Sequence, residues 1–210
     1  MNIAFDVDGV LWDIETFQLK YGKPYFARKN IPLSDPSGFG IREMFHCSEQ
    51  EEKKFWILSI PKVFFAKARE HAREVVREMK QRGHRIFIIT SRARTTDHSL
   101  AGAFMRKALK AWLKRNGIEY DEILFCQDDS ENFSKKQACQ SRAVDFIVED
   151  RWENIQLLKK VTRVIGFRTR NNQNYADFSV PFVHSFLEVQ TELEKSIREM
   201  VAEMKPFFSE

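Results

Sequence analysis

The chain has 210 residues, of which 43% are hydrophobic and 30% charged, and its formal net charge at neutral pH is +4. This length and composition exclude a mainly disordered protein and favour one domain of about 150 residues with an insertion. The mild positive charge favours an anionic substrate, but it is too dispersed for a protein that binds a nucleic-acid polymer.

The three cysteines, Cys47, Cys126 and Cys139, show no paired spacing, so the sequence predicts neither a disulfide framework nor a zinc site. No run of about 18 apolar residues occurs, and the first predicted strand has no signal-like segment before it. We therefore expect a protein of the reducing cytoplasm that is not secreted and has no membrane partner.

The first predicted element is a buried strand over residues 3–7, and two carboxylates, Asp6 and Asp8, stand where it ends. Two such groups are costly to desolvate unless a cation lies with them, and a hard divalent ion such as Mg²⁺ prefers oxygen ligands. Gly9 allows a sharp turn, and the apolar residues 10–12 stand where a calcium loop needs oxygen ligands. The pattern favours metal-assisted phosphoryl transfer, with a purely structural turn as the alternative.

A long stretch, from about residue 14 to residue 72, separates this strand from the first helix that can cover a sheet. A connection of this length indicates an insertion. Helical spacing over residues 14–30 and 48–58, with prolines and glycines between them, predicts a small helical cap over residues 16–72. We expect the cap over the carboxyl ends of the strands, where ligands bind in open α/β sheets, and we expect it to influence substrate choice.

The rest of the chain alternates short apolar runs with segments of helical spacing, which is typical of a parallel α/β sheet covered on both faces. We predict a Rossmann-like parallel sheet sandwiched by helices, with its core in residues 1–15 and 73–210. The expected strands cover residues 3–7, 85–90, 122–126, 145–148 and 162–167, and the expected helices cover residues 66–82, 100–116 and 134–142. Gly83 and Gly117 are expected to end the first two of these helices.

A helical stripe of apolar residues runs from about residue 185 to residue 205. Such a stripe usually packs against its own domain, and a homodimer contact is the alternative. No internal repeat or low-complexity linker interrupts the chain.

Polar residues follow the second predicted strand, over residues 85–90. Thr90 ends this strand, and Ser91 and Arg92 come next. The Thr90 hydroxyl can donate to a phosphoryl oxygen with nearby backbone N–H groups, although Thr and Ser also cap helices routinely. Arg92 is a candidate for binding an anionic group of the substrate, with a surface ion pair as the alternative.

Two more carboxylates, Glu149 and Asp150, follow the fourth predicted strand and bring further negative charge to the same edge of the sheet. Like charges gathered at one place indicate a cation. Lys135 lies upstream, and its ammonium group can compensate the charge of both a nucleophile and a phosphate.

Together these segments resemble the haloacid dehalogenase superfamily of aspartate-dependent phosphatases, whose four motifs occur here in order and at strand ends. Residues 6–10 resemble the first motif, Thr90 with Ser91 the second, Lys135 the third, and Glu149, Asp150 and Asn154 the fourth. The resemblance covers residues 1 to about 185. It implies the predicted fold, with the cap inserted after the first strand.

The resemblance also implies that Asp6 attacks phosphorus to form an aspartyl-phosphate, while Asp8 protonates the leaving oxygen and then activates water. This division suits a phosphoryl group, which needs an in-line nucleophile, a proton donor and positive charge around its oxygens. Lys135 and a Mg²⁺ cofactor supply that charge. The implied metal ligands are the Asp6 carboxylate, the Asp8 main-chain carbonyl and the Asp150 carboxylate, with Glu149 behind them.

Two features depart from the superfamily pattern. Asn154 stands where many members have an acidic residue, so its link to the metal is open. Lys136 competes with Lys135 for the role of the third motif, and the spacing to Glu149 favours Lys135.

Within the superfamily, the chain looks most like the cytosolic 5'(3')-deoxyribonucleotidases and their bacterial relatives. The similarity is carried by residues 3–13, by Tyr21, Tyr25 and Phe39-Gly40 in the cap, and by residues 112–121. The cap aromatics can stack on a nucleobase or simply pack together.

The expected function is that of a Mg²⁺-dependent phosphomonoesterase acting on a small phosphorylated metabolite, with nucleoside 5'- or 3'-monophosphates first. A sugar-phosphate phosphatase or a phosphomutase uses the same motifs and is the enzymatic alternative. A catalytically idle module that binds an anion or a metal is the alternative of another class.

Overall fold

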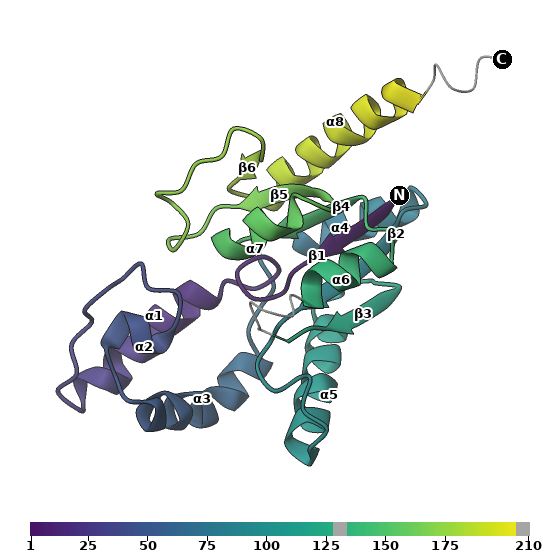
Figure 1. Ribbon diagram of the computed structural model, residues 1–210. Coiled ribbons are helices and arrows are strands. Elements are labelled where there is room, and N and C mark those ends of the chain that lie inside the picture. The colour runs from purple at the N-terminus through teal and green to yellow at the C-terminus, as the bar shows by residue number, and fades with distance from the viewer. Residues whose placement is uncertain (128–133, 205–210) are drawn as a thin grey trace.

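The structure is a computed structural model, and it describes residues 1–127 and 134–204. Within this part of the chain, six strands form one sheet in the order β3-β2-β1-β4-β5-β6 (Figure 1). Every neighbouring pair is parallel. The predicted parallel α/β fold is confirmed.

The strands lie close to their expected positions. Their bounds are β1 (Asn2–Phe5), β2 (Arg85–Thr90), β3 (Glu122–Phe125), β4 (Phe146–Glu149), β5 (Arg163–Phe167) and β6 (Phe182–Val183). The first strand ends at Phe5, although Asp6 still donates its N–H to Val148 O. The sixth strand was not predicted, because two residues are too few to show a period.

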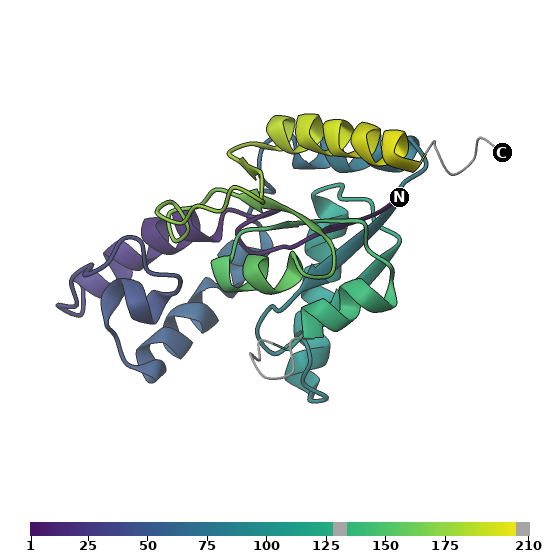
Figure 2. The same ribbon diagram turned by 45° about the horizontal axis from the view of Figure 1, so that its top comes forward.

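Helices cover both faces of the sheet. On one face, α4 (Ala72–Gln81), α5 (Leu100–Arg115) and α8 (Phe186–Met204) pack against one side of the strands, and α4 and α8 run side by side (Figure 2). On the other face lie α6 (Ser134–Ser141) and α7 (Trp152–Leu158). The alternation of β1 explains the two cores, because Ile3 and Phe5 belong to the first and Ala4 to the second.

The predicted C-terminal stripe packs against its own domain. Phe186, Val189 and Leu193 are buried in the core, and Ile197 is partly buried against it. Val201 is exposed. None of the helices in the described segments is long and apolar enough to cross a membrane.

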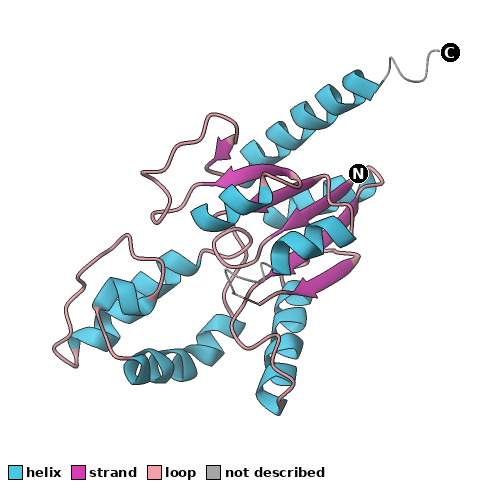
Figure 3. Cartoon of the chain, in the orientation of Figure 1, coloured by secondary structure: helices cyan, strands magenta, loops and turns pink. Residues whose placement is uncertain are grey.

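Three helices lie apart from the sheet, beyond the carboxyl ends of the strands (Figure 3). They are α1 (Ile14–Ala27), α2 (Ile41–Phe45) and α3 (Glu49–Phe64). Aromatic side chains form their interior, and the ring centroids of Phe26 and Phe45 are 4.5 Å apart. This group, which we call the cap, occupies the stretch that was predicted as an insertion. Its boundaries at residues 16 and 72 stay a prediction.

Two helix predictions were wrong in detail. The helix expected from residue 66 begins at Ala72. Residues 66–71 form a connection instead, in which Ala68 N–H donates to Asn116 Oδ1, Arg69 N–H donates to Leu11 O, and His71 has a φ of 60°. The stretch expected to be irregular contains α2, a helix too short to show a clear period. The ends at Gly83 and Gly117 are confirmed by φ angles of 84° and 68°.

Candidate active site

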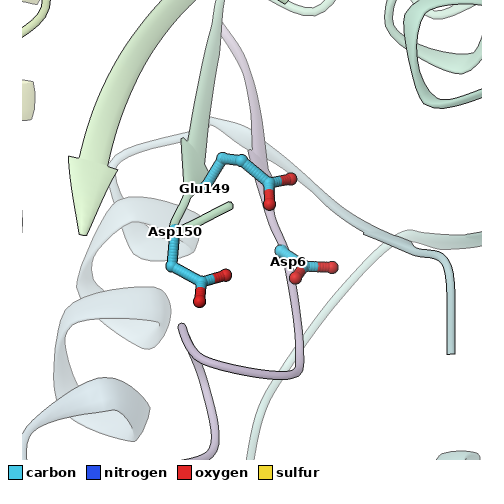
Figure 4. A group of neighbouring side chains, drawn as sticks. All are labelled: Asp6, Glu149 and Asp150. Carbon is cyan, nitrogen blue, oxygen red and sulfur yellow. The ribbon is translucent and has the colours of Figure 1, made fainter. Parts of the chain in front are cut away.

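Three carboxylates meet at the carboxyl edge of the sheet. Asp6 follows β1, Glu149 ends β4 and Asp150 comes next, and β1 and β4 are neighbours with Phe5 paired to Val148. One oxygen of each carboxylate lies within 4.8 Å of the others, and all three side chains are buried. Figure 4 shows the three groups gathered where β1 and β4 end. The parallel pairing therefore brings together residues that are far apart in the sequence.

Lys135 of α6 supplies a buried positive charge. Its Nζ lies 2.9 Å from Asp6 Oδ1 and 2.7 Å from Glu149 Oε2. The other oxygen of Glu149 accepts hydrogen bonds from Arg151 N–H and Asn154 Nδ2, each at 3.2 Å. Both oxygens of Glu149 therefore have partners, and one of them orients the lysine. Asn154 acts on the site through its hydrogen bond to Glu149. The structure places Lys135 in this cluster and leaves Lys136 half-exposed.

The cluster carries more negative than positive charge. Burial raises the pKa of Asp6 to about 7, against the lowering effect of Lys135. Burial, with the charges of Glu149 and Asp6, also raises the pKa of Asp150 well above its usual range. For Lys135, burial lowers the pKa, but the charges of Asp6 and Glu149 outweigh it and hold the pKa above its ordinary value.

The free oxygens of this cluster fit a hard divalent cation. Among the described residues, no group donates a hydrogen bond to the Asp150 carboxylate, although that carboxylate is buried. Gly9 has a φ of +93°, and a Cβ there would lie 2.0 Å from Asp150 Oδ2. The loop therefore requires glycine so that the backbone can pass close to this carboxylate. The acidic cluster is compatible with metal binding.

Asn172 fixes the backbone of Asp150, and the sequence reasoning missed it. Its Nδ2 donates to Asp150 O at 2.6 Å and to Phe167 O at 2.8 Å, and its Oδ1 accepts from Thr169 N–H at 3.1 Å. Its side chain is completely buried. Several asparagines follow β5, and such residues favour turns for local reasons, so the sequence carries no signal that separates this one.

Arg92 binds Asp8. Its Nε lies 3.0 Å from Asp8 Oδ2 and its Nη2 lies 2.5 Å from Asp8 Oδ1, so the guanidinium group engages both carboxylate oxygens. The Arg92 guanidinium also lies over the Trp12 ring, 5.0 Å from its centroid. The predicted anion-binding arginine is thus paired with the second aspartate of the first motif.

Thr90 and Ser91 lie where β2 ends, one strand away from Asp6. Thr90 is buried, and its carbonyl accepts a hydrogen bond from Cys126 N–H. Ser91 is half-buried, with its Oγ 3.5 Å from Gln127 O. Both residues stand at the edge of the sheet that carries the carboxylates.

Residues 1–197, which contain this whole site, match the model of the 5' nucleotidase, deoxy (pyrimidine), cytosolic type C protein family. The chain belongs to this family. A candidate nucleotidase of Oceanobacillus iheyensis is 27% identical to this chain over 197 residues, which cover 90% of this chain and 98% of that protein. The chain is therefore an enzyme of the phosphatase and nucleotidase class.

Solved structures share the fold. A predicted phosphatase from Clostridium acetobutylicum has a TM-score of 0.63 at 18% identity, covering 92% of this chain and 98% of that one. A haloacid dehalogenase family hydrolase from Deinococcus radiodurans, solved with phosphate and sodium, has a TM-score of 0.64 at 13% identity, covering 92% and 95%. A β-phosphoglucomutase from Clostridium difficile has a TM-score of 0.61 at 13% identity, covering 96% and 98%. These likenesses confirm the haloacid dehalogenase fold.

Proposed function

We propose that this enzyme is a Mg²⁺-dependent phosphomonoesterase that forms an aspartyl-phosphate on Asp6. The observation that carries the proposal is the buried cluster of Asp6, Lys135 and Asp150 at the carboxyl ends of β1 and β4. A nucleophilic carboxylate, a fixed ammonium and a free acidic group are the elements that phosphoryl transfer needs in one place.

In this proposal Asp6 attacks phosphorus, and Lys135 stabilises the negative charge of both Asp6 and the phosphoryl oxygens. The Asp6 and Asp150 carboxylates, with the Asp8 main-chain carbonyl, would hold Mg²⁺, which supplies further positive charge to the phosphoryl group. Glu149 keeps the lysine in place from the other side. Thr90 and Ser91 bind phosphoryl oxygens with their hydroxyl groups.

Asp8 is the proposed acid and base. It protonates the oxygen of the leaving group and then takes a proton from the water that hydrolyses the aspartyl-phosphate. The Arg92 guanidinium binds both of its oxygens and so determines where that carboxyl group stands. Arg92 also follows β2 at this edge of the sheet, where its guanidinium group can contact an anionic substrate.

Nucleoside 5'- or 3'-monophosphates are the proposed substrates. The description of the family supports a nucleotide, and the cap presents aromatic side chains, among them Phe39, which is 39% exposed. We also propose that the protein is cytoplasmic, because the family description names a cytosolic type. A phosphatase or mutase that acts on sugar phosphates uses the same groups and is the second candidate.

The test is hydrolysis of p-nitrophenyl phosphate with Mg²⁺ by the Asp6→Asn variant. We expect a loss of about 10³-fold or more in kcat, because the amide cannot attack phosphorus. Asp97→Asn is the matched control, since Asp97 is exposed and lies outside the cluster, and its kcat should not change. Undiminished turnover by Asp6→Asn would exclude the proposed nucleophile.

A panel of nucleoside and sugar monophosphates separates the remaining candidates. Free phosphate released from nucleotides supports the proposed substrate class. Isomerised sugar phosphate without free phosphate indicates a mutase. Saturable binding of phosphates without any turnover indicates the idle module.

A further inference from the structure

A cavity lies between the two chain segments that connect the cap to the sheet. Its volume is about 480 Å³, and its walls come from residues 12–21 at the start of the cap and residues 61–67 at its end. We call it the linker pocket. None of the proposed catalytic groups, Asp6, Asp8 or Lys135, lines it.

The linker pocket has an excess of positive charge. Lys20, Lys62 and Lys67 line it, and none of the three forms an ion pair with any residue in the parts of the chain that the structure describes. Asp13 is the acidic residue of the wall. Its carboxylate is already compensated, since it caps α1 through Thr16 N–H and lies 3.2 Å from Arg69 Nη1. The lysines therefore have no counterion within the pocket.

Two of these lysines converge on one aromatic ring from opposite walls. Lys20 Nζ, from α1, lies 5.4 Å from the centroid of the Tyr21 ring, and Lys62 Nζ, from α3, lies 4.7 Å from it. The ring attracts each ammonium group and so gathers two positive charges at one residue. An anion bound beside this ring would offset these charges and join the two walls.

The pocket also offers an apolar contact surface. Phe65 lines it and is 72% exposed, although burying a phenylalanine side chain is favourable by about 1.5–3 kcal/mol. Trp12 and Phe17 provide buried rings behind it, with centroids 5.2 Å apart. A planar apolar group placed in the pocket would cover the exposed ring. The walls thus select for an anionic group attached to an aromatic body.

We propose that the linker pocket is a second ligand site, which binds a small molecule carrying a phosphate or similar anionic group on an aromatic ring. Lys20 and Lys62 bind the anionic group, and Phe65 contacts the ring. Such a ligand comes from one of two sources, either a remote part of the substrate or a separate effector. Trp12 lies between the pocket and the proposed catalytic groups. Its ring contacts the Arg92 guanidinium, which in turn binds the Asp8 carboxylate.

The probe for this site is 1-naphthylphosphonate, a dianion on an aromatic ring whose P–C bond a phosphomonoesterase does not cleave. Binding is measured by calorimetry on the full chain with a chelator present. Lys20 and Lys62 lie outside the catalytic cluster, so the part of the binding that is lost when they are replaced belongs to the linker pocket. This measurement does not depend on turnover, so its failure is separate from a failure of the proposed function.

We expect the Lys20→Gln/Lys62→Gln variant to bind the probe about tenfold more weakly, since two contacts to a charged group are lost. The matched control is Lys23→Gln/Lys110→Gln, which changes the net charge equally but removes exposed lysines outside the pocket. The control should bind within about twofold of the unmodified chain. Equal weakening in both variants, or no saturable binding to the unmodified chain, would overturn the proposal.

A second variant tests the aromatic contact and leaves Lys20 and Lys62 in place. Phe65→Ala should weaken binding of 1-naphthylphosphonate about tenfold and leave binding of methylphosphonate unchanged, because only the first probe has a ring. An equal effect on both probes contradicts the assignment of Phe65. With Mg²⁺ and p-nitrophenyl phosphate, competitive inhibition by the naphthyl probe that weakens in Lys20→Gln/Lys62→Gln identifies a substrate subsite, and a change in kcat identifies an effector site.

Discussion

Lys135 is held between two buried carboxylates at the site. Its Nζ is within 3.0 Å of oxygens on both Asp6 and Glu149, at 2.9 and 2.7 Å. Removing one partner of a buried ionic group is costly because the remaining charges lose their compensation. The lysine should therefore matter for folding as well as for the reaction.

We predict that Lys135→Met lowers the free energy of unfolding by about 3–5 kcal/mol, since it leaves Asp6 and Glu149 buried without a counterion. Urea denaturation followed by circular dichroism measures this. Lys136→Met is the control, because Lys136 is half-exposed and its loss should cost about 0.5 kcal/mol or less. Equal losses for the two variants would show that Lys135 is not the lysine of the cluster in solution.

The pKa of Asp6 predicts how Mg²⁺ binding depends on pH. Folding raises this pKa from 3.8 to about 7, so the metal-free folded state binds more protons than the unfolded state between these values. The stability contributed by the proton is present below the lower value and is lost as the pH rises through about 7. Mg²⁺ needs the ionised carboxylate, so its binding should strengthen over the same range.

Millimolar Mg²⁺ should therefore raise the melting temperature more at about pH 8 than at about pH 6. Differential scanning calorimetry at both pH values checks this prediction. Asp6→Asn should reduce the difference, because the amide does not titrate. A Mg²⁺ effect that is equal at the two pH values in the unmodified chain would contradict it.

The sequence predicted which residues stand at the carboxyl edge of the sheet but not how they are held there. Asp6, Thr90, Glu149 and Asp150 could be placed because each ends or follows a strand, and parallel strands end at one edge. The contacts of Asn172 with Asp150 and of Arg92 with Asp8 join loops that only the tertiary fold brings together. No local pattern encodes such pairs.

At the scale of elements, α1 is tied to the sheet by a buried carboxylate. Glu15 accepts hydrogen bonds from Arg170 N–H at 2.8 Å and from Asn171 N–H at 3.0 Å, in the loop that follows β5. The same loop contains Asn172, which holds Asp150. The start of the cap and a proposed metal ligand are thus attached to one short segment.

We predict that Glu15→Ala lowers the free energy of unfolding by about 1–3 kcal/mol, because the N–H groups of Arg170 and Asn171 lose their acceptor. Glu15→Gln keeps one carbonyl acceptor and should lose less. Glu74→Ala, at an exposed position of α4, serves as the control and should change stability by about 0.5 kcal/mol or less. Thermal and urea denaturation measure all three, and a loss for Glu74→Ala as large as that for Glu15→Ala would contradict the assignment.

The long helices and the strands of four or more residues were predicted well, and the shortest elements were not. Helix α5 was expected over residues 100–116 and spans Leu100–Arg115, because several turns display the apolar period. The five residues of α2 and the two of β6 cannot display one. The late start of α4 has another cause, since residues 66–71 make hydrogen bonds to Leu11 and Asn116 instead of continuing the helix.

At the scale of the whole molecule, the three cysteines lie in two different parts of the fold, so their reactivity can be used to compare those parts. Cys126 and Cys139 are buried in the core between the sheet and α6 and α7, while Cys47 lies partly exposed in the cap. Burial raises the pKa of all three thiols, to about 12 for Cys139. The thiolate is the reactive form, so both burial and pKa protect the core pair.

We predict that iodoacetamide alkylates Cys47 of the native protein at least about tenfold faster than Cys126 or Cys139, as measured by peptide mass spectrometry. The core pair should react only when the sheet unfolds, so their rate should follow the population of the unfolded state. A ligand that stabilises the fold, such as Mg²⁺, should then slow Cys126 and Cys139 and leave Cys47 unchanged. If Cys139 reacts in the native state as fast as Cys47, the face of the sheet under α6 opens without global unfolding, and Lys135, which α6 carries, is less firmly held than its contacts with Asp6 and Glu149 indicate.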